Sequence, residues 1–463
     1  MRLLISALLL VGTLSAKPNV VFMMADDLGW NDVGYHGSEI RTPNIDGLVA
    51  EGVELNRYYA FPVCSPTRAA LMTGRSPIRL GVDRPIEKLN GTPLDEHFIS
   101  QTFQSAGYQT ILSGKWHLGL SHVDYLPGAR GFDSWYGHIG PMVDYNTHIW
   151  EGGLDWNRDG KVVEEPGYTT TLIGDATAKY LRERDKSKPT FIYVAFNAPH
   201  TPLQAPAEKV DEYRLIEDRS RKIYAAMVTM MDTEVGKILD TLKEEGMEKD
   251  TIVVWVSDNG GATNAGANNS PLRNGKAHAF EGGIRVPGVI RWPGELEPGK
   301  FDQQITVLDW LPTLAAAADV PVGSNKKLDG YNLWPALKDG KKIERGPTVI
   351  GMMNTFSVFH DGWKYLEDKG RGETETLPYL FRILDDPNEK NNLVTKHPDV
   401  VKEMAGLLRS VPRTPTVSPD FLPPDQAGGG AGGKKGGKKK KKDALAGWSR
   451  ITGAPWIERA KRD

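Results

Sequence analysis

Four short apolar runs, rich in β-branched and aromatic residues, have the pattern of buried β-strands. They cover residues 19–24, 109–112, 190–196 and 251–257. Two segments between the runs, 172–184 and 221–243, carry apolar side chains at helical spacing, which is typical of amphipathic helices. Strands that alternate with helices predict an α/β fold with a large, mostly parallel mixed sheet flanked by helices. We expect this domain to cover residues 17–345.

The pattern changes near residue 346, where short strand-like runs follow one another without helices between them. The runs cover residues 348–353, 357–360, 363–366 and 380–384. A helix-like segment over residues 400–409 comes after them. We therefore expect a small C-terminal α+β subdomain over residues 346–411 that carries an antiparallel sheet.

The first residues have the composition of a secretory signal peptide. Arg2 precedes an apolar run over residues 3–14, which ends at the small residues Ser15 and Ala16. A buried N-terminal strand or helix is the alternative. The run is too short to span a bilayer comfortably, and no later run is longer and equally apolar. We expect residues 1–16 to be cleaved from an exported protein, periplasmic or extracellular, without an integral membrane segment.

The last 52 residues, 412–463, form a low-complexity segment rich in Pro, Gly and Lys. Residues 427–442 contain only Ala, Gly and seven Lys, a composition that cannot bury enough apolar surface to fold. This predicts a flexible, solubilising tail, with contact to polyanions as the alternative. Removing those lysines changes the formal net charge from −2 to −9. The overall balance gives no indication of a nucleic-acid partner, and we expect none.

Cys64 is the only cysteine of the 463 residues. A single cysteine cannot form an internal disulfide, although exported proteins often rely on them. An intermolecular bridge, an inert buried thiol and a chemical role remain open. The residues around it favour the third, because Ser65 and Pro66 suit a helix start and Gly74 suits its end. Cys64 would then lie at a helix N-terminus, where negative charge is favoured.

Polar residues follow each of the four predicted strands. They are Asp26 and Asp27, then Lys115 and His117, then His200, and finally Asp258 and Asn259. In open α/β sheets, ligands bind beyond the carboxyl ends of the strands. A solvated loop could explain any one of these groups, but four strand ends that carry them predict a common site.

The motif Cys64-x-Pro66-x-Arg68, followed by Thr73-Gly74-Arg75, resembles the signature of the type I sulfatases, a family within the alkaline phosphatase superfamily. Five further motifs agree with the family in the expected order along residues 18–340. They are 25–29 (ADDLG), 114–119 (GKWHLG), 199–200 (PH), 258–261 (DNGG), and Lys276 followed by 281–283 (EGG). The resemblance implies an alkaline phosphatase-like fold and a sulfuric ester hydrolase.

The resemblance also implies how the site is built. In this family a separate maturation enzyme oxidises the motif cysteine to formylglycine, whose hydrate attacks sulfur. The implied ligands of one Ca²⁺ are Asp26, Asp27, Asp258, Asn259 and the formylglycine hydrate made from Cys64. This set suits a hard cation, which prefers oxygen ligands. The implied sulfate-binding residues are Lys115, His200 and Lys276.

Four residues receive catalytic roles by the same resemblance. Cys64 supplies the nucleophile, and Arg68 and His117 hold the oxygens of the hydrate. His117 is also the implied base for the second hydroxyl, whose collapse to the aldehyde expels sulfate. His200, alone or with Lys276, would protonate the leaving alcohol.

Within the family, the sequence is most similar to arylsulfatase B-like N-acetylgalactosamine-4-sulfatases. The similar stretches are 26–34, 40–43, 200–204 and 328–331. The lack of further cysteines and the Lys/Gly tail depart from the animal enzymes and suggest a bacterial exported protein. A sulfated sugar of a glycosaminoglycan or an algal polysaccharide is the expected substrate.

Two other functions compete with this interpretation. A phosphoester or phosphonate hydrolase of the same superfamily could use a similar nucleophile and metal. The second is a carbohydrate-binding protein on a degenerate sulfatase scaffold, which would catalyse no reaction. In such a protein, some of the catalytic residues would be missing. Every matched position carries the expected residue type, which favours an enzyme.

Overall fold

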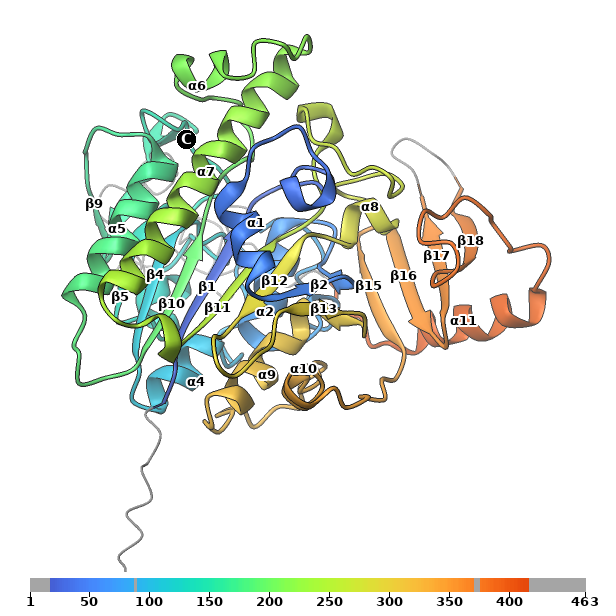
Figure 1. The fold of residues 1–463 in the computed structure, drawn as a ribbon. Coiled ribbons are helices and arrows are strands. Elements are labelled where there is room, and N and C mark those ends of the chain that lie inside the picture. Colours follow the sequence, from blue (N-terminus) through green and yellow to red (C-terminus); the bar gives the residue numbers. More distant parts are fainter. Residues whose placement is uncertain (1–16, 87–89, 370–374, 416–463) are drawn as a thin grey trace, which may run out of the picture.

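The structure is a computed structural model that describes residues 17–86, 90–369 and 375–415. The predicted signal peptide and nearly all of the predicted tail lie outside these residues. The described part is built around one ten-stranded sheet, with a separate four-stranded sheet on one side (Figure 1). Among the described helices, none combines the length and the apolar character that crossing a membrane requires.

The centre of the large sheet is parallel, as the sequence predicts. Its strands are β11 (Thr251–Ser257), β1 (Asn19–Ala25), β10 (Thr190–Ala195), β4 (Gln109–Gly114) and β5 (Ser134–Gly137), in that order. The four runs predicted from the sequence are four of these strands. Nearly all of their residues are buried, which explains why they are apolar without alternation.

Antiparallel and short strands complete the edges of this sheet, so it is mixed. On one edge lie β12 (Gly288–Arg291), β2 (Val53–Leu55) and β13 (Gly299–Phe301), and on the other lie β8 (Asn157–Arg158) and β9 (Lys161–Val162). Two small sheets pair β14 (Ile305–Thr306) with β3 (Tyr58–Tyr59), and β6 (Ile149–Trp150) with β7 (Gly153–Leu154). The predicted fold class, a mostly parallel mixed sheet flanked by helices, is confirmed.

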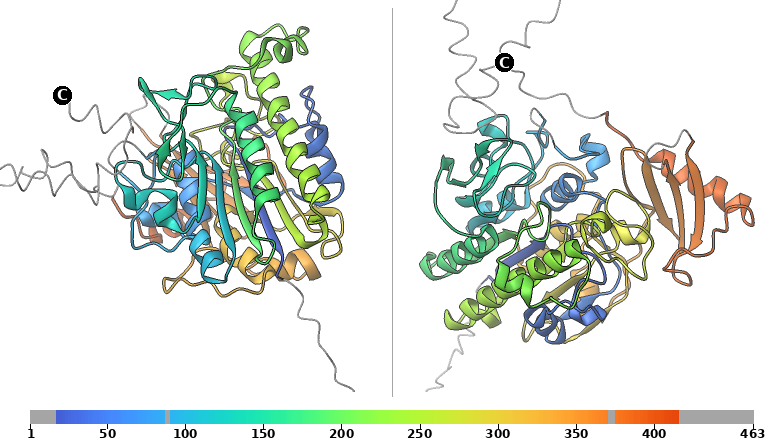
Figure 2. Two further views of the ribbon diagram at one scale, coloured as in Figure 1. Left: turned by 90° about the vertical axis from the view of Figure 1, so that its left-hand side faces the viewer. Right: turned by 90° about the horizontal axis from the view of Figure 1, so that it is seen from above.

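Helices cover both faces of the sheet, and the two faces form separate apolar cores. On one face α5 (Thr169–Glu183) and α7 (Arg219–Glu244) run side by side (Figure 2), with α1 (Pro43–Ala50) beside them. The other face is covered by α2 (Cys64–Thr73), α4 (Ile99–Ser105) and α9 (Trp310–Ala317). Strand β1 contributes to both cores, because Val21 and Met23 lie in the first and Val20 and Phe22 in the second.

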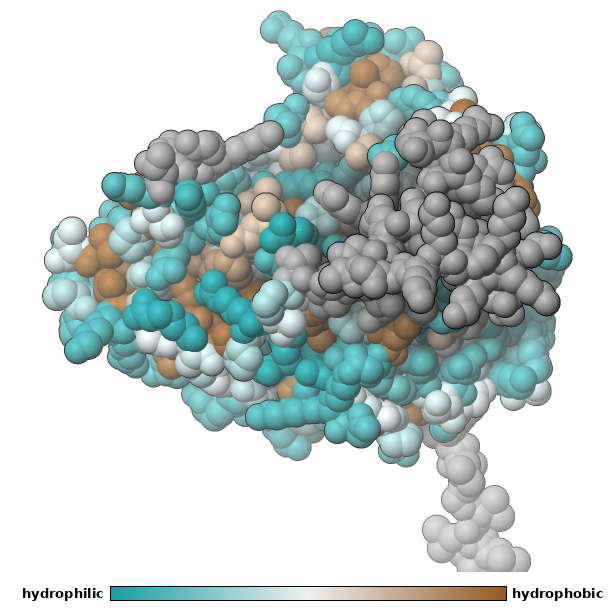
Figure 3. Space-filling view, turned by 180° about the vertical axis from the view of Figure 1, so that it is seen from behind, coloured by the Kyte–Doolittle hydropathy of each residue, from teal (hydrophilic) through white to brown (hydrophobic). Residues whose placement is uncertain are grey.

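Short helices lie in the connections between these elements. The α-helices are α3 (Pro77–Leu80), α6 (Ala207–Asp211), α8 (Glu281–Ile284) and α10 (Trp334–Asp339). The 3₁₀ helices are Gly34–His36, Val123–Tyr125, Pro127–Arg130, Glu248–Asp250, Thr263–Ala265 and Val307–Asp309. Over the face of the molecule turned away from the view of Figure 1, apolar and hydrophilic side chains are interspersed (Figure 3).

The C-terminal strands form an antiparallel meander, as predicted. The strands β15 (Thr348–Met352), β16 (Thr355–His360), β17 (Trp363–Asp368) and β18 (Leu377–Arg382) pair in sequence order, and α11 (Pro398–Ser410) packs on β16 and β17. Seen from above, this sheet stands at one side of the main body (Figure 2). The elements fall within the predicted span of residues 346–411, whose bounds stay a prediction.

A buried group of three charges connects the small sheet to the main body. Lys364 on β17 lies 2.9 Å from Glu281 on α8 and 2.7 Å from Glu389, and all three side chains are at most 1% exposed. The backbone N–H of Glu281 donates to Glu389 at 2.7 Å. Helix α8 lies next to the loop after β11, since the N–H of Gly260 donates to the carbonyl of Gly283. The charge group thus holds the small sheet against the end of β11.

We expect Lys364→Met to lower the free energy of unfolding by about 3 kcal/mol, because it removes the ammonium group that both buried carboxyl groups contact. Urea unfolding followed by fluorescence measures the change. The matched control is Lys300→Met, since Lys300 pairs with Glu54 at 3.1 Å but is 52% exposed. That variant should change stability by less than about 1 kcal/mol. Equal effects of the two substitutions would contradict a structural role for the buried group.

Candidate active site

The ends of four parallel strands bring the predicted site residues together. Asp26 and Asp27 follow β1, and the residues after β4, β10 and β11 lie beside them. The backbone fixes this arrangement, since Asp26 N–H donates to the carbonyl of Ala198 at 3.0 Å and Asp258 N–H donates to that of Ala25 at 3.0 Å. The predicted residues at these ends are all buried: Asp26, Asp27, Lys115, His117, His200, Asp258 and Asn259.

Several of these residues occupy backbone conformations that L-amino acids rarely adopt. Asp27 has φ 69° and His117 has φ 55°, and left-handed conformations of non-glycine residues occur often at functional sites. The loop that carries Lys276 contains a third case, Ala277, with φ 71°. The N–H of Ala277 donates to the carbonyl of Pro62 at 2.8 Å. This bond ties the Lys276 loop to the segment before Cys64.

Cys64 begins helix α2, and its thiol is buried at the site. The helix ends at Gly74, which has φ 63° as a C-cap, as predicted. The sulfur lies 3.2 Å from Nδ1 of His117. The predicted N-cap at Ser65 is wrong, because the N-cap is Val63 and makes no side-chain cap bond. The Ser65 hydroxyl instead donates to the carbonyl of His117 at 3.0 Å and accepts from the N–H of Ile86, so it positions the His117 segment.

Arg68 lies one turn further along α2 and is completely buried. Its guanidinium donates to Oδ2 of Asp258 at 2.8 Å and lies 3.7 Å from Oδ1 of Asp26. It also donates to the hydroxyl of Tyr193 at 3.2 Å. Tyr193 was not predicted as a site residue, because in the sequence it is one aromatic residue within a buried strand. Its position on β10 under the arginine becomes visible only once β10 is placed beside β1.

Two lysines and a histidine lie beside the two aspartates that follow β1. Lys115 lies 2.7 Å from Oδ2 of Asp26, and Lys276 lies 2.6 Å from Oδ2 of Asp27. Nε2 of His200 is 3.6 Å from the same Asp27 oxygen. All ten predicted site residues therefore lie in one connected group around Asp26, Asp27 and Asp258.

The charges around the site shift the pKa values of its carboxyl groups in opposite directions. Burial alone would raise the pKa of Asp26 and of Asp27, but the lysines and His200 beside them hold both pKa values below the ordinary range. Burial and the neighbouring Asp26 carboxylate raise the pKa of Asp258, although Arg68 opposes the shift. The site thus brings three carboxyl groups together with three cations, Arg68, Lys115 and Lys276, whose charges balance them.

Cys64 and His117 form a buried pair, and the shifts of their pKa values favour the neutral form of each. Burial raises the pKa of the Cys64 thiol, even though Lys115 and Lys276 act against the shift. Burial, together with Lys115 and Arg68, lowers the pKa of His117 well below its ordinary value. An unmodified thiol in this position would stay protonated near neutral pH, which makes it a weak nucleophile. The neutral imidazole is able to accept a proton.

The oxygen atoms of the site fit a hard divalent cation. Asp26, Asp27 and His200 offer ligand atoms that lie within 4.8 Å of one another. Among the described residues, Oδ1 of Asp26 and Oδ1 of Asn259 are buried oxygens without a hydrogen-bond partner. Nδ2 of Asn259 donates to Oδ1 of Asp27 at 2.8 Å, which brings the amide beside the carboxylates. Carboxylate and amide oxygens are the ligands that Ca²⁺ prefers.

Comparison with known proteins agrees with this geometry. Residues 18–320 match the profile of the family described as Sulfatase. The chain is 32% identical to mouse (Mus musculus) arylsulfatase J, over 86% of the chain and 76% of that protein. It is 34% identical to human (Homo sapiens) N-acetylgalactosamine-6-sulfatase, over 81% of each.

A solved structure, that of Ps i-CgsB in complex with k-i-k-neocarrahexaose, has the same fold. It superposes with a TM-score of 0.81 at 33% identity, over 86% of this chain and 94% of the other. The described fold and the match over residues 18–320 both agree with the expectation from the sequence motifs. The chain belongs to the type I sulfatase family of the alkaline phosphatase superfamily and is a sulfuric ester hydrolase.

Proposed function

We propose that the protein is an exported, calcium-dependent sulfatase that removes O-sulfate from a sulfated polysaccharide, with a formylglycine made from Cys64 as its nucleophile. The observation that carries this proposal is the position of Cys64. Its sulfur lies 3.2 Å from His117, in a group that contains three buried carboxyl groups, three cationic side chains and His200. The substrate class is supported by the relatives, one named an N-acetylgalactosamine-6-sulfatase and one solved with a neocarrahexaose.

Asp26, Asp27, Asp258 and Asn259 would hold Ca²⁺, together with residue 64 in its modified form. When bound, the ion would supply positive charge that polarises sulfate oxygens and lowers the pKa of a coordinated hydroxyl. Among the described residues, His200 also offers a possible metal-ligating nitrogen close to Asp26 and Asp27. We assign it to the substrate, because the oxygen-rich set already satisfies a hard cation.

Formylglycine at position 64 would supply, as its hydrate, one hydroxyl for attack and a second for release of sulfate. A separate maturation enzyme would have to make it. Two side chains, Arg68 and His117, would act beside this position. Arg68 lies one turn further along α2 and donates to the carbonyl of Lys115 at 3.4 Å, and the His117 imidazole, 3.2 Å from the sulfur, can take the proton of the second hydroxyl.

The cationic side chains would bind the sulfate and assist departure of the alcohol. Lys115 lies beside Asp26, and Lys276 lies beside Asp27. Held in a buried site, they stabilise the charge that builds up on the sulfate oxygens in the transition state. His200, 3.6 Å from Asp27, would protonate the leaving oxygen, alone or with Lys276.

Mass spectrometry of the Cys64 peptide from active enzyme tests the nucleophile. We expect the aldehyde or its hydrate, and an unmodified thiol throughout fully active protein would refute the proposed chemistry. The reaction class is tested with 4-nitrophenyl sulfate and 4-nitrophenyl phosphate on the same preparation. We expect a higher kcat/KM on the sulfate ester, and faster turnover of the phosphate ester would favour a phosphoester hydrolase instead.

A further inference from the structure

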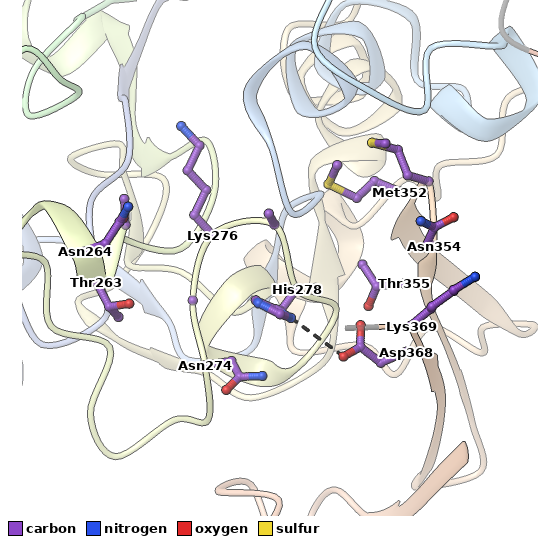
Figure 4. A pocket seen from close by; sticks show the side chains of 14 residues that line it. Thr263, Asn264, Asn274, Lys276, His278, Met352, Asn354, Thr355, Asp368 and Lys369 are labelled. Atoms are coloured by element: carbon purple, nitrogen blue, oxygen red, sulfur yellow. Dashed lines mark ion pairs between the residues drawn. The ribbon is translucent and has the colours of Figure 1, made fainter. Parts of the chain in front are cut away.

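A cavity of about 600 Å³ lies next to the site, between the Lys276 loop and the C-terminal sheet. One wall is formed by residues 262–264 and 274–278. The other wall is formed by residues 352–355 and 368–369, from the β15–β16 turn and the end of β17 (Figure 4). The two walls are 74 residues or more apart in the sequence.

Lys276 connects this cavity to the sulfatase site. Its side chain lines the cavity and is 22% exposed, while its ammonium group lies 2.6 Å from Asp27. A substrate whose sulfate lies beside Lys276 would therefore have its remaining part at the mouth of the cavity. The cavity lies within the size range of about 300–1,000 Å³ that encloses a drug-sized ligand, which is larger than one monosaccharide.

The two walls meet at a pair of side chains, His278 and Asp368. Nδ1 of His278 lies 3.7 Å from Oδ2 of Asp368, and the histidine side chain is 37% exposed against 12% for the aspartate. Figure 4 marks this contact, which runs from the loop that carries Asn274 and Lys276 to the strand end that carries Asp368. The carboxylate thus holds the imidazole at the cavity lining, to which both side chains belong.

The rest of the lining has the character of a sugar-binding surface. Asn264, Asn274 and Asn354 present amide groups that both donate and accept hydrogen bonds. Met353 adds apolar surface at 44% exposure. A sugar ring carries hydroxyl groups on an apolar frame. Such a ring suits this mixture of amide and apolar groups better than a fully charged ligand does.

The Lys276 wall is held in place before any ligand binds. Asn274 has φ 60° and Ala277 has φ 71°. A Cβ on Gly275 would lie 2.5 Å from both the Asn269 amide nitrogen and the carbonyl oxygen of Gly261. A loop packed this closely cannot move far, so binding a ligand would cost little ordering of this wall.

We propose that this cavity binds the sugar unit next to the sulfated one, and that His278, oriented by Asp368, hydrogen-bonds to the hydroxyl groups of that unit. The inference rests on the proposed function and deepens it, because it makes the preferred substrate an oligosaccharide and not a single sulfated sugar. His278 and Asp368 become specificity-determining and positioning residues, and the C-terminal sheet becomes part of the substrate site.

The test compares substrates with and without the adjoining sugar. The probes are 4-nitrophenyl sulfate and tetrasaccharides of chondroitin 6-sulfate and of ι-carrageenan. For His278→Ala, we expect the ratio of kcat/KM on the better tetrasaccharide to kcat/KM on 4-nitrophenyl sulfate to fall about tenfold, mainly through KM. Asp368→Asn should lower the ratio in the same direction, because it leaves the ring without its orienting charge.

The matched control is His360→Ala. His360 also lies on the C-terminal sheet and pairs with an aspartate, Asp361, at 3.6 Å, but it does not line the cavity. This variant should keep the wild-type ratio. An unchanged ratio for His278→Ala, or equal losses on both substrates, would overturn the inference and leave the proposed function intact. Wild-type enzyme that hydrolyses none of the sulfate esters would overturn the proposed function itself.

Discussion

Cys64→Ala is expected to lower the hydrolysis of sulfate esters by about 10⁴-fold or more, with the fold retained. Replacing a covalent nucleophile removes the pathway itself, and losses of this size are typical of such residues. The fold should survive, because the side chain is small and its polar contact, to Nδ1 of His117, is a weak thiol interaction. The measurement is kcat/KM on 4-nitrophenyl sulfate, with thermal melting to compare the variant with the wild type.

Cys64→Ser is the companion variant. A serine keeps a polar side chain at the helix N-terminus but offers a single hydroxyl, so it should be as inactive as the alanine variant. The exception is a host whose maturation system also oxidises serine, and mass spectrometry of the peptide identifies that case. If Cys64→Ala kept more than about a hundredth of wild-type activity with no change in melting, residue 64 would not be the nucleophile.

Much of the main sheet could be predicted from the sequence, for a physical reason. Parallel strands buried on both faces are short, continuous apolar runs, and such runs stand out at 19–24, 109–112, 190–196 and 251–257. Polar residues that follow them must lie at one edge of the sheet, because parallel strands end on the same side. The two segments with helical spacing were predicted for the same kind of reason, and α5 and α7 extend them by a few residues.

The edges of the sheet could not be predicted in this way. Strands β8 and β9 have two residues each, and a pair of residues carries no periodicity. The order of the strands is also set by tertiary packing, so the contact between Tyr193 and Arg68 has no local signal. The failed cap at Ser65 has a similar cause. Serine is a good N-cap in isolation, but its hydroxyl is used here to hold the backbone at His117 and Ile86.

Long-range charge pairs were missed for the same reason. Lys364 and Glu389 belong to none of the sequence motifs, and their burial with Glu281 follows only from the packing of the small sheet against α8. The pair of His278 and Asp368 joins the same two parts of the chain. The sequence motifs identify the family and the reaction class, whereas the cavity proposed to select a substrate depends on how two distant segments meet.

Removal of Ca²⁺ is expected to abolish activity and to lower the melting temperature of the wild-type enzyme. The ion would supply several kcal/mol of transition-state stabilisation, so a chelator should lower kcat by about 10³-fold. A ligand that binds only the folded state stabilises that state by about 2.7 kcal/mol when its free concentration is a hundred times Kd. Added Ca²⁺ should therefore restore activity and raise the melting temperature together. Thermal melting across a Ca²⁺ titration gives a readout that does not depend on turnover.

The substitution Asn259→Ala tests whether Asn259 binds Ca²⁺ or is an ordinary buried amide. Asn259 is buried, its Oδ1 makes no hydrogen bond within the described residues, and its Nδ2 donates to Oδ1 of Asp27. Asn157 has the same features away from the site, with an unpartnered Oδ1 and an Nδ2 that donates to Asp155 at 3.0 Å. Both variants lose a buried hydrogen bond, but only Asn259→Ala loses a proposed ligand. It should need at least about tenfold more Ca²⁺ for half-maximal stabilisation, whereas Asn157→Ala should follow the wild-type curve at a lower melting temperature. Identical Ca²⁺ curves for the two variants would remove Asn259 from the ligand set.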